Sequence, residues 1–286
     1  MTAAPVILDG RVLAREVREE LKGRVASLRE RGVVPRLEAV VAAQDPASLA
    51  YVEMKKKWAG WVGVESGTFM VDASVSESEV MDQVARLNAD SGVHGVLIQH
   101  PLPGHIDEDM VLESLGAEKD VDGITSASLG RLTAGIQGFR CATPLGITKL
   151  LERYQVQCEG KNALVIGRSN ILGKPMALML LERNATVTIA HSRTKDLAEL
   201  CQTMDIVVAA VGRAEMVKGD WLKPGAVVID AGYNKVEGRG HDVGDCEYES
   251  CAAIASAITP VPGGVGPMTV ASLLMNTVEA AEATLN

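Results

Sequence analysis

The sequence lacks the cysteine and histidine patterns that mark disulfide-rich or zinc-binding proteins. Its five cysteines show no C-x-x-C spacing, and its five histidines include no H-E-x-x-H pair. It also lacks an apolar run of membrane-spanning length and the basic and apolar segments of a signal peptide. We therefore expect a cytoplasmic protein with no disulfide framework, no metal site and no membrane partner.

Positive charge is in short supply as well. The net charge of -9 at pH 7 argues against a general affinity for nucleic acid. Apolar residues, in contrast, are plentiful. They make up 47% of the 286 positions, which is enough to build the cores of two modest domains.

Strand-like and helix-like segments alternate along most of the chain, which predicts an α/β protein with parallel sheets covered by helices. Apolar residues at helical spacing from Val12 to Leu28 precede a strand over 37–43. Asp45-Pro46 then starts a second helix. Ser76-x-x-Glu79 forms a capping box that opens a third helix, and a buried strand follows at 93–98.

The boundary between two domains is predicted near residues 140–150, where Thr143-Pro144 is typical of a helix N-cap and first helical position. We place the first domain at residues 1–140 and the second at 141–267. A last helix starts at Pro267, and residues 268–286 are expected to return to the first domain and complete it. Further strands of the second domain are predicted at 205–209 and 226–231.

The segment from Ala163 to Pro175 predicts a strand, a glycine turn and a helix N-terminus, an arrangement that suits a pyrophosphate. Ser169 takes the place of the middle glycine of G-x-G-x-x-G, so an ordinary glycine turn is the alternative. After the next strand, at 185–190, the chain offers His191-Ser192-Arg193 where NAD would want an acidic residue. Together with Arg168, these residues suit a 2'-phosphate and favour NADP over NAD.

Three segments carry candidate catalytic residues. Tyr51 and Lys55 are four apart on a predicted helix and share one face, although most helical lysines are simply solvated. Gln99 ends a predicted buried strand, where the sites of open α/β sheets tend to lie. The loop from Asp120 to Gly123, which contains Asp122, is ambiguous because Asp and Gly are ordinary turn formers.

Residues 259–269 are too rich in proline and glycine for a strand or a helix. Such a segment lets backbone approach a ligand closely, and a rigid interdomain linker is the alternative. Because Val261-Pro262 precedes a Gly-Gly pair at a sharp turn, we predict a cis peptide bond there.

Taken together, these motifs resemble the bifunctional methylenetetrahydrofolate dehydrogenase/methenyltetrahydrofolate cyclohydrolase family over nearly the whole chain. The motifs that carry the resemblance are Asp45-Pro46-Ala47-Ser48, Tyr51-Val52-x-x-Lys55-x-Lys57, Gln99-x-Pro101-Leu102-Pro103, Lys119-Asp120-Val121-Asp122-Gly123, Gly167-Arg168-Ser169-x-x-x-Gly173-x-Pro175, Asp230-x-Gly232-x-Asn234 and residues 259–269.

The resemblance implies an N-terminal α/β folate-binding and catalytic domain, a Rossmann-like NADP-binding domain and an active site in the cleft between them. It also implies a homodimer formed through the cofactor domains. The implied reactions are NADP-dependent oxidation of 5,10-methylenetetrahydrofolate to 5,10-methenyltetrahydrofolate and hydrolysis of that product to 10-formyltetrahydrofolate.

The family's functional residues fall on matching positions of this chain. Lys55 matches the general acid/base, Tyr51 the ring that packs on the folate, and Gln99 the glutamine beside the lysine. Asp122 matches the acid that binds the pterin, and backbone at Pro262 and Gly263 matches the lining of the folate site. The residues expected to bind NADP are Gly167, Arg168, Ser169, Gly173, His191, Ser192, Arg193, Gly212 and Tyr233.

To act as a base, Lys55 needs a pKa below its ordinary value of about 10.4. Burial would lower that pKa, whereas a nearby Asp122 would raise it. The chain departs from the family at His100, where leucine is usual, at Trp58, where alanine is usual, and at Tyr233, where an aliphatic residue is frequent. Two alternatives therefore stay open: a dehydrogenase without the hydrolytic step, and a non-catalytic NADP-binding regulatory module.

Overall fold

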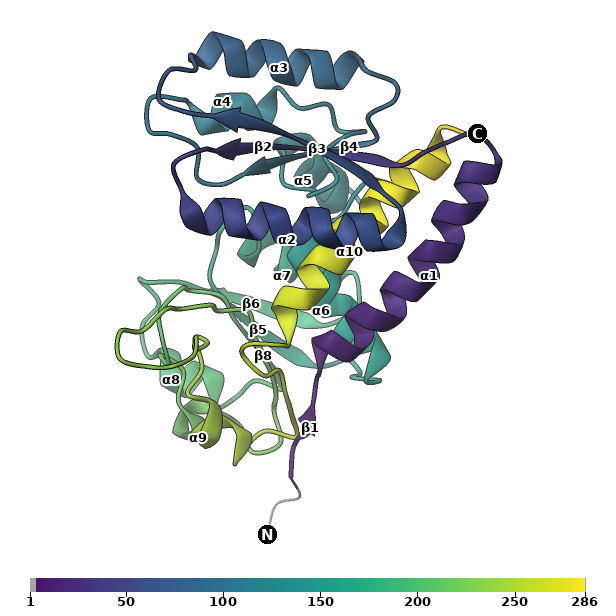
Figure 1. The fold of residues 1–286 in the computed structure, drawn as a ribbon. Coiled ribbons are helices and arrows are strands. Elements are labelled where there is room, and N and C mark those ends of the chain that lie inside the picture. The colour runs from purple at the N-terminus through teal and green to yellow at the C-terminus, as the bar shows by residue number, and fades with distance from the viewer. Residues whose placement is uncertain (1–3, 286) are drawn as a thin grey trace. The chain divides into compact units, whose positions relative to one another are not determined.

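The computed structural model describes residues 4–285 and divides into two compact units (Figure 1). The six-stranded unit comprises Met1–Arg15 and Thr143–Thr269, and the three-stranded unit comprises Glu16–Ala142 and Val270–Asn286. Each unit is built on a parallel sheet, so the predicted α/β class is confirmed.

The N-terminal segment belongs to the six-stranded unit, whereas the sequence placed it in the first domain. The reason is strand pairing: β1 (Val6–Ile7) lies parallel to β9 (Ala257–Ile258), and Leu8 N–H extends the ladder by donating to Ile258 O over 2.9 Å. A two-residue strand has no detectable alternation, so only its partner reveals it.

The three-stranded unit has the strand order β3-β2-β4. These strands are β2 (Arg36–Ala42), β3 (Glu65–Val71) and β4 (Gly95–Gln99), and both neighbours pair with β2 in parallel. Figure 1 shows α2 (Pro46–Val62) and α3 (Glu77–Ala89) on opposite faces of this sheet. Two shorter helices, α4 (Glu108–Glu113) and α5 (Ser126–Thr133), follow β4 along the chain.

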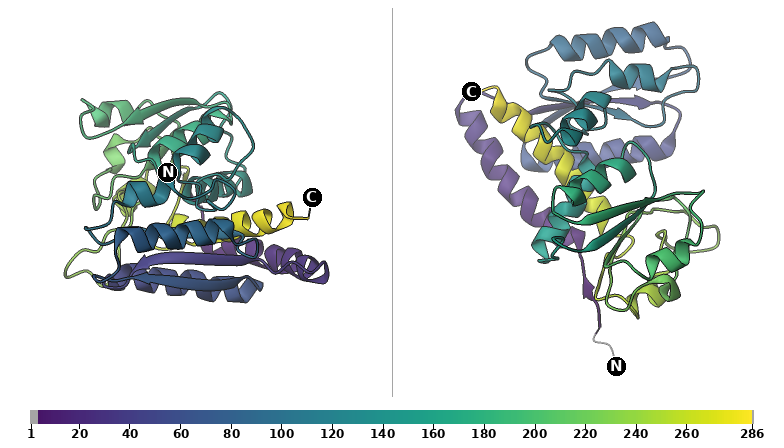
Figure 2. Two further views of the ribbon diagram at one scale, coloured as in Figure 1. Left: turned by 90° about the horizontal axis from the view of Figure 1, so that it is seen from above. Right: turned by 180° about the vertical axis from the view of Figure 1, so that it is seen from behind.

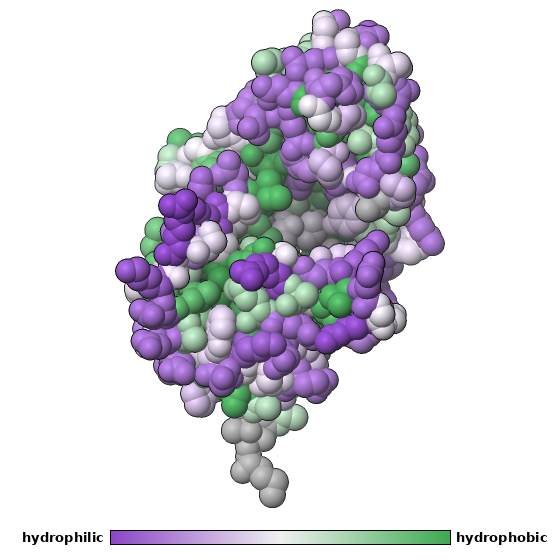
Figure 3. Space-filling model, turned by 90° about the vertical axis from the view of Figure 1, so that its left-hand side faces the viewer, coloured by the Kyte–Doolittle hydropathy of each residue, from purple (hydrophilic) through white to green (hydrophobic). Residues whose placement is uncertain are grey.

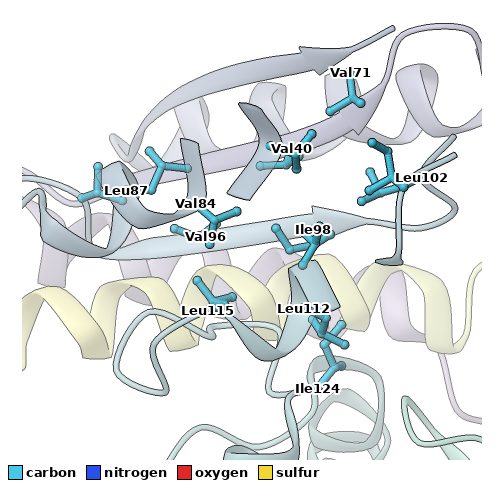
Figure 4. Packing of buried hydrophobic residues seen from close by; sticks show 14 of the residues in the cluster. Val40, Val71, Val84, Leu87, Val96, Ile98, Leu102, Leu112, Leu115 and Ile124 are labelled. Atoms are coloured by element: carbon cyan, nitrogen blue, oxygen red, sulfur yellow. The ribbon is translucent and has the colours of Figure 1, made fainter. Parts of the chain in front are cut away.

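One hydrophobic cluster of this unit packs between the sheet and helices α3 and α4 (Figure 4). Val40, Val96 and Ile98 point from β2 and β4, and Val84 and Leu87 meet them from α3. All five are buried. Burying one such aliphatic side chain contributes about 1.5 to 3 kcal/mol, so this layer fixes the carboxyl end of β4, where Gln99 lies.

The predicted capping box at the start of α3 is confirmed. Glu79 N–H donates to Ser76 Oγ over 3.3 Å, and Ser76 N–H donates to Glu79 Oε2 over 2.8 Å. Two backbone donors that lack helical partners are thereby satisfied.

Helices α1 (Gly10–Glu30) and α10 (Val265–Ala283) lie side by side in both views of Figure 2. Arg24 Nη2 and Glu282 Oε2, 2.7 Å apart, join them. Most of α10 belongs to the three-stranded unit, as the sequence predicts, although the helix begins two residues before Pro267.

The six-stranded unit has the strand order β1-β9-β8-β7-β5-β6 with all strands parallel. Its central strands are β5 (Asn162–Ile166), β6 (Thr186–Ala190), β7 (Ile206–Ala209) and β8 (Val227–Asp230). After β5 the chain adds β6 on one side and then β7 on the other. This reversal marks the carboxyl ends of β5 and β7 as the topological switch point, where such sheets bind ligands.

The helices of the six-stranded unit are α6 (Ala142–Arg153), α7 (Gly173–Leu181), α8 (Leu197–Cys201) and α9 (Tyr248–Ala252), with a 3₁₀ turn at Gly219–Trp221.

The expectation that Thr143 caps a helix is wrong. Helix α6 already begins at Ala142, so Thr143 lies in its first turn. The Thr143 hydroxyl instead lies 3.0 Å from the hydroxyl of Thr269.

The peptide bond between Val261 and Pro262 is cis, as predicted, and a second cis bond joins His100 to Pro101.

Within residues 4–285, no helix is long and apolar enough to cross a membrane. Hydrophilic residues predominate on the face drawn in Figure 3.

Candidate active site and nucleotide site

Lys55 lies on α2 with its amine buried in the three-stranded unit. The side chain is only 5% exposed. Its Nζ donates to Gln99 Oε1 over 3.0 Å and lies 4.4 Å from the centroid of the Tyr51 ring. Burial lowers the pKa of Lys55 to about 8, against the opposing effect of the Asp122 carboxylate. Lys55 can therefore exchange a proton near neutral pH, unlike an ordinary surface lysine.

Tyr51 presents its ring to the amine one helical turn away, as the four-residue spacing predicts. Burial and the Asp122 carboxylate both raise the pKa of the Tyr51 phenol. The phenol therefore stays neutral, and its ring adds an apolar wall beside Lys55.

Gln99 connects the amine to the segment that follows β4. Its Oε1 accepts from Lys55, so its Nε2 is free to donate to the backbone oxygen of His100 over 3.0 Å. Ser48 Oγ, at the start of α2, also contacts this oxygen over 3.3 Å. These bonds fix the amide so that its oxygen faces the amine.

His100 occupies a position where the sequence suggested a departure from the resembled family. Its Nδ1 lies 2.6 Å from Glu108 Oε1, and Glu108 Oε2 accepts from Leu102 N–H over 2.6 Å. Its buried Nε2 has no hydrogen-bond partner among the residues that the structure describes. Trp58, the other departure in this unit, has its ring covered by Arg18, whose Cζ lies 4.3 Å from the ring centroid.

Asp120 and Asp122 share one loop but have different surroundings. The fully buried Asp120 carboxylate holds the loop itself, accepting hydrogen bonds from donors of Gly123, Ile124, Thr125 and Ser128. Burial raises the pKa of Asp122, while the Lys55 ammonium opposes this effect. Asp122 is therefore the carboxyl group that is electrostatically coupled to Lys55.

Helix α10 holds the same loop through a residue that sequence reasoning missed. Asn276 Nδ2 donates to Val121 O over 2.7 Å and to Arg140 O over 3.0 Å. Gly123 is required beside it, since its φ is +69° and a Cβ there would lie 2.6 Å from the Arg140 carbonyl carbon. The available signal was an amide side chain, Asn276, within the apolar stretch 270–278 of the last helix.

In the six-stranded unit, the predicted phosphate loop follows β5. Gly167 has a φ of +132°, and a Cβ there would lie 2.2 Å from Ala210 O, at the end of β7. A Cβ on Gly173 would lie 2.4 Å from Gly167 O. Both glycines thus allow backbone to pack where a side chain could not, and α7 starts directly behind the loop. This arrangement fits a pyrophosphate at the helix N-terminus.

Ser169 takes part in the loop rather than merely replacing a glycine. Its Oγ accepts from the N–H groups of Leu172 and Gly173, over 3.2 and 3.3 Å. The exposed side chain of Arg168 precedes it.

The segment after β6 carries the residues expected near a 2'-phosphate. His191 N–H donates to Thr194 Oγ1 over 2.9 Å, and Arg193 N–H donates to His191 Nδ1 over 3.1 Å. Ser192 and Arg193 are exposed. Because β5 and β6 are adjacent, this turn and the phosphate loop end neighbouring strands of one sheet edge.

Gly212 and Tyr233 follow β7 and β8 at that edge. Gly212 is exposed, with a φ of +64°. Tyr233 is 62% exposed, and its hydroxyl donates to Asp242. The structure therefore gathers the predicted cofactor residues at the carboxyl ends of four neighbouring strands.

Pro262 and Gly263 lie in the six-stranded unit, in the loop between β9 and α10. The N–H groups of Gly10 and Arg11 donate to Gly263 O over 3.0 and 3.2 Å, and Arg11 Nη2 donates to Pro262 O over 3.2 Å. Gly10 and Arg11, at the start of α1, thus hold this loop in place. Sequence reasoning identified the loop but missed Arg11.

A hollow also lies at the opposite, amino-terminal edge of the six-stranded sheet, and none of the predicted site residues lines it. Tyr154, Asp205, Lys223 and Ser256 are among the residues that line it. Two of its charged residues already pair with each other, since Lys223 Nζ lies 2.6 Å from Asp205 Oδ1. Across residues 4–285, no group of three or more His, Cys, Asp or Glu side chains is arranged to hold a metal ion.

Two family models match the chain. One describes the catalytic domain of tetrahydrofolate dehydrogenase/cyclohydrolase and matches residues 8–122. The other describes the NAD(P)-binding domain of the same enzymes and matches residues 141–285.

Curated relatives and solved structures agree with these matches. The chain is 52% identical to the bifunctional protein FolD of Rhodospirillum rubrum, with 97% of each chain covered, and 47% identical to that of Shouchella clausii, with coverages of 98% and 99%. A crystal structure of the bifunctional FolD dehydrogenase/cyclohydrolase of Campylobacter jejuni is 41% identical, with a TM-score of 0.96 over 98% of this chain and all of that one. The Trypanosoma brucei enzyme, complexed with NADP and an inhibitor, is 34% identical, with a TM-score of 0.95 over the whole of both chains.

Proposed function

Because the chain belongs to the tetrahydrofolate dehydrogenase/cyclohydrolase family, we propose that Lys55 is the acid/base of a folate site in the three-stranded unit. The chain is a bifunctional enzyme that uses NADP to oxidise 5,10-methylenetetrahydrofolate and then hydrolyses the methenyl product to 10-formyltetrahydrofolate. The observation that carries the proposal is the buried Lys55 amine held by the Gln99 amide.

Hydrolysis of the methenyl cation needs a base and then an acid. In the proposed step, neutral Lys55 accepts a proton as water adds to the one-carbon bridge. The resulting ammonium returns a proton to the ring nitrogen as its bond to that carbon breaks. A pKa of about 8 suits both roles, because the amine and the ammonium are each well populated near neutral pH.

Gln99 and Tyr51 support this proton transfer without adding charge. The Gln99 oxygen orients the amine, and the Tyr51 ring offers an apolar face on which a folate ring can pack. We assign Asp122 to the pterin, since a carboxylate can accept hydrogen bonds from neighbouring ring and amino N–H groups.

The six-stranded unit binds NADP, which accepts the hydride in the first reaction. In our proposal the Gly167–Gly173 loop takes the pyrophosphate, and Arg168 and Arg193 take the 2'-phosphate. His191, Ser192, Gly212 and Tyr233 line the rest of the site. The close approaches of Gly167 to Ala210 O and of Gly173 to Gly167 O support this assignment, because they leave no room for side chains at the two glycines of the loop.

The two reactions can be assayed separately. NADPH formation from 5,10-methylenetetrahydrofolate should proceed with NADP and much more slowly with NAD. Hydrolysis of 5,10-methenyltetrahydrofolate, followed by loss of its absorbance, should proceed without any nucleotide. If the wild-type enzyme shows NADPH formation but no hydrolysis above the buffer rate, the acid/base role of Lys55 is excluded.

We also propose a cytoplasmic homodimer formed through the six-stranded unit. Strand β6 is an edge of the sheet, and Ile189 on this strand is 42% exposed. An open strand edge with apolar side chains favours pairing with a second copy. Ile189→Lys should shift the mass measured by light scattering from dimer to monomer, and a monomeric wild type would contradict the proposal.

A further inference from the structure

The fully buried carboxylate of Asp245 ties two loops of the six-stranded unit together. Its Oδ2 accepts from the N–H groups of Val211 and Gly212, over 2.6 and 3.0 Å. Its Oδ1 accepts from Arg213 N–H over 2.8 Å and from Asn234 Nδ2 over 2.9 Å. One side chain therefore holds three consecutive residues after β7 and a fourth residue after β8.

Asp230, at the end of β8, fixes Asp245 from the other side. Asp230 Oδ1 accepts from Asp245 N–H over 2.9 Å, and its Oδ2 accepts from Cys246 N–H over 2.8 Å. Glycine backbone packs directly against both carboxylates. A Cβ on Gly232 would lie 2.4 Å from Asp245 Oδ1, and one on Gly244 would lie 1.8 Å from Asp230 Oδ2. The Asp245 carboxylate is thus anchored to the sheet itself.

The segment that Asp245 holds borders the switch point between β5 and β7. Ala210 O, just before this segment, is the atom that faces Gly167 of the phosphate loop. Gly212, within the segment, has a φ of +64°, a conformation that three converging N–H bonds to one carboxylate maintain. Tyr233 directly precedes the fourth anchor, Asn234.

We infer that Asp245 is a positioning residue for NADP: its carboxylate holds the Val211–Arg213 segment and Asn234 in the arrangement that the nucleotide requires. Asp245 does not touch the ligand in this inference, since all four of its bonds reach backbone or side-chain donors of the same unit. The inference rests on the proposed role of Gly212 and Tyr233 at the cofactor site.

Hydrolysis of 5,10-methenyltetrahydrofolate provides an internal control, because that reaction needs Lys55 but no NADP. Asp245→Ala should raise the Kd for NADP, measured by calorimetry, and the KM for NADP by about tenfold or more, the loss expected when charge-assisted hydrogen bonds are removed. Asp245→Asn, which keeps one acceptor oxygen, should fall between wild type and Asp245→Ala. The kcat at saturating NADP and the rate of methenyl hydrolysis should change by less than about twofold.

Asp205→Asn is the matched control. Asp205 is also a carboxylate of this unit that accepts a backbone N–H, from Asn162 over 2.9 Å, but it lies at the amino-terminal edge of the sheet. Its replacement should lower the melting temperature and leave the Kd for NADP unchanged. If Asp245→Ala does not fold, Asn234→Ala removes one of the four bonds and should raise the Kd for NADP by a smaller factor.

An unchanged Kd for NADP in the soluble Asp245 variants, or in Asn234→Ala if those do not fold, would overturn the inference. Parallel losses of NADP binding and methenyl hydrolysis would overturn it too, because they indicate general destabilisation. A wild type that binds NADP but oxidises no folate would contradict the proposed function alone, and the Kd series would still decide the role of Asp245.

Discussion

Lys55 Nζ and Gln99 Oε1, 3.0 Å apart, link helix α2 to the carboxyl end of strand β4. The acceptor is an uncharged amide, so the contact orients the amine without holding it in its charged form. A carboxylate in the same place would do both, since an opposite charge at this distance raises the pKa of an amine.

Gln99→Glu should therefore slow methenyl hydrolysis at pH 7 and move its pH profile to higher pH by roughly one to three units. Gln99→Met, which removes the hydrogen bond but adds no charge, is the control and should lower the rate without an alkaline shift. Rates would be measured from pH 6 to 10. A Gln99→Glu profile that coincides with the wild type would show that the amide does not control the charge of Lys55.

Lys55→Met should abolish methenyl hydrolysis, because an apolar chain of similar length cannot carry protons. NADPH formation should fall less, and the circular dichroism spectrum should be unchanged. In the wild type, hydrolysis should rise with pH through about 8, because the neutral base becomes available as the ammonium loses its proton. Full hydrolytic activity in the purified variant would rule out Lys55 as the acid/base.

Arg168→Ala combined with Arg193→Ala should raise the KM for NADP far more than the KM for NAD. A charge-assisted contact contributes about 1.5 to 3 kcal/mol, so two contacts to the 2'-phosphate account for at least a hundredfold preference. The measurement is steady-state kinetics with each nucleotide at saturating folate. Equal losses with both nucleotides would remove the basis for assigning these arginines to the 2'-phosphate.

The Asp230 carboxyl should make stability depend on pH. Burial raises its pKa from 3.8 to about 6, against hydrogen bonds from the backbone N–H groups of Cys246, Asp245 and Gly232. Between these two values the folded state binds more protons than the unfolded state, so the free energy of unfolding decreases as pH rises toward 6.

Asp230→Asn cannot ionise, so its free energy of unfolding should decrease less than that of the wild type between pH 4 and 7. Urea denaturation at four pH values would measure both slopes. Identical slopes would show that Asp230 has the same pKa in the folded and unfolded chain.

The sequence predicted best those elements whose signals are local. The Ser76 capping box, the helix after Asp45 and the strand that ends at Gln99 were all recognisable from a few neighbouring residues. Strands β1 and β9 have two residues each. Strand β9 pairs with β8 as well, whereas β1 forms only by pairing with β9 across some 250 positions. No local pattern records such a pairing.

The residues that support the candidate sites were harder to predict than the residues assigned to them. Asn276, Asp245 and Arg11 all act on backbone atoms far away in the sequence. Their side chains carry no motif of their own, because carboxylate, amide and guanidinium groups occur at many positions of the chain without such a role. Only the folded chain shows which distant N–H or C=O each one meets.

The pairing of β1 with β9 also constrains how the protein is made. During synthesis, β1 leaves the ribosome some 250 residues before β9, so this edge of the sheet stays incomplete until β9 has emerged. Neither unit is continuous in sequence, and a fragment that starts at Thr143 lacks the strand that covers β9. Truncation from the N-terminus therefore damages the unit farthest along the chain.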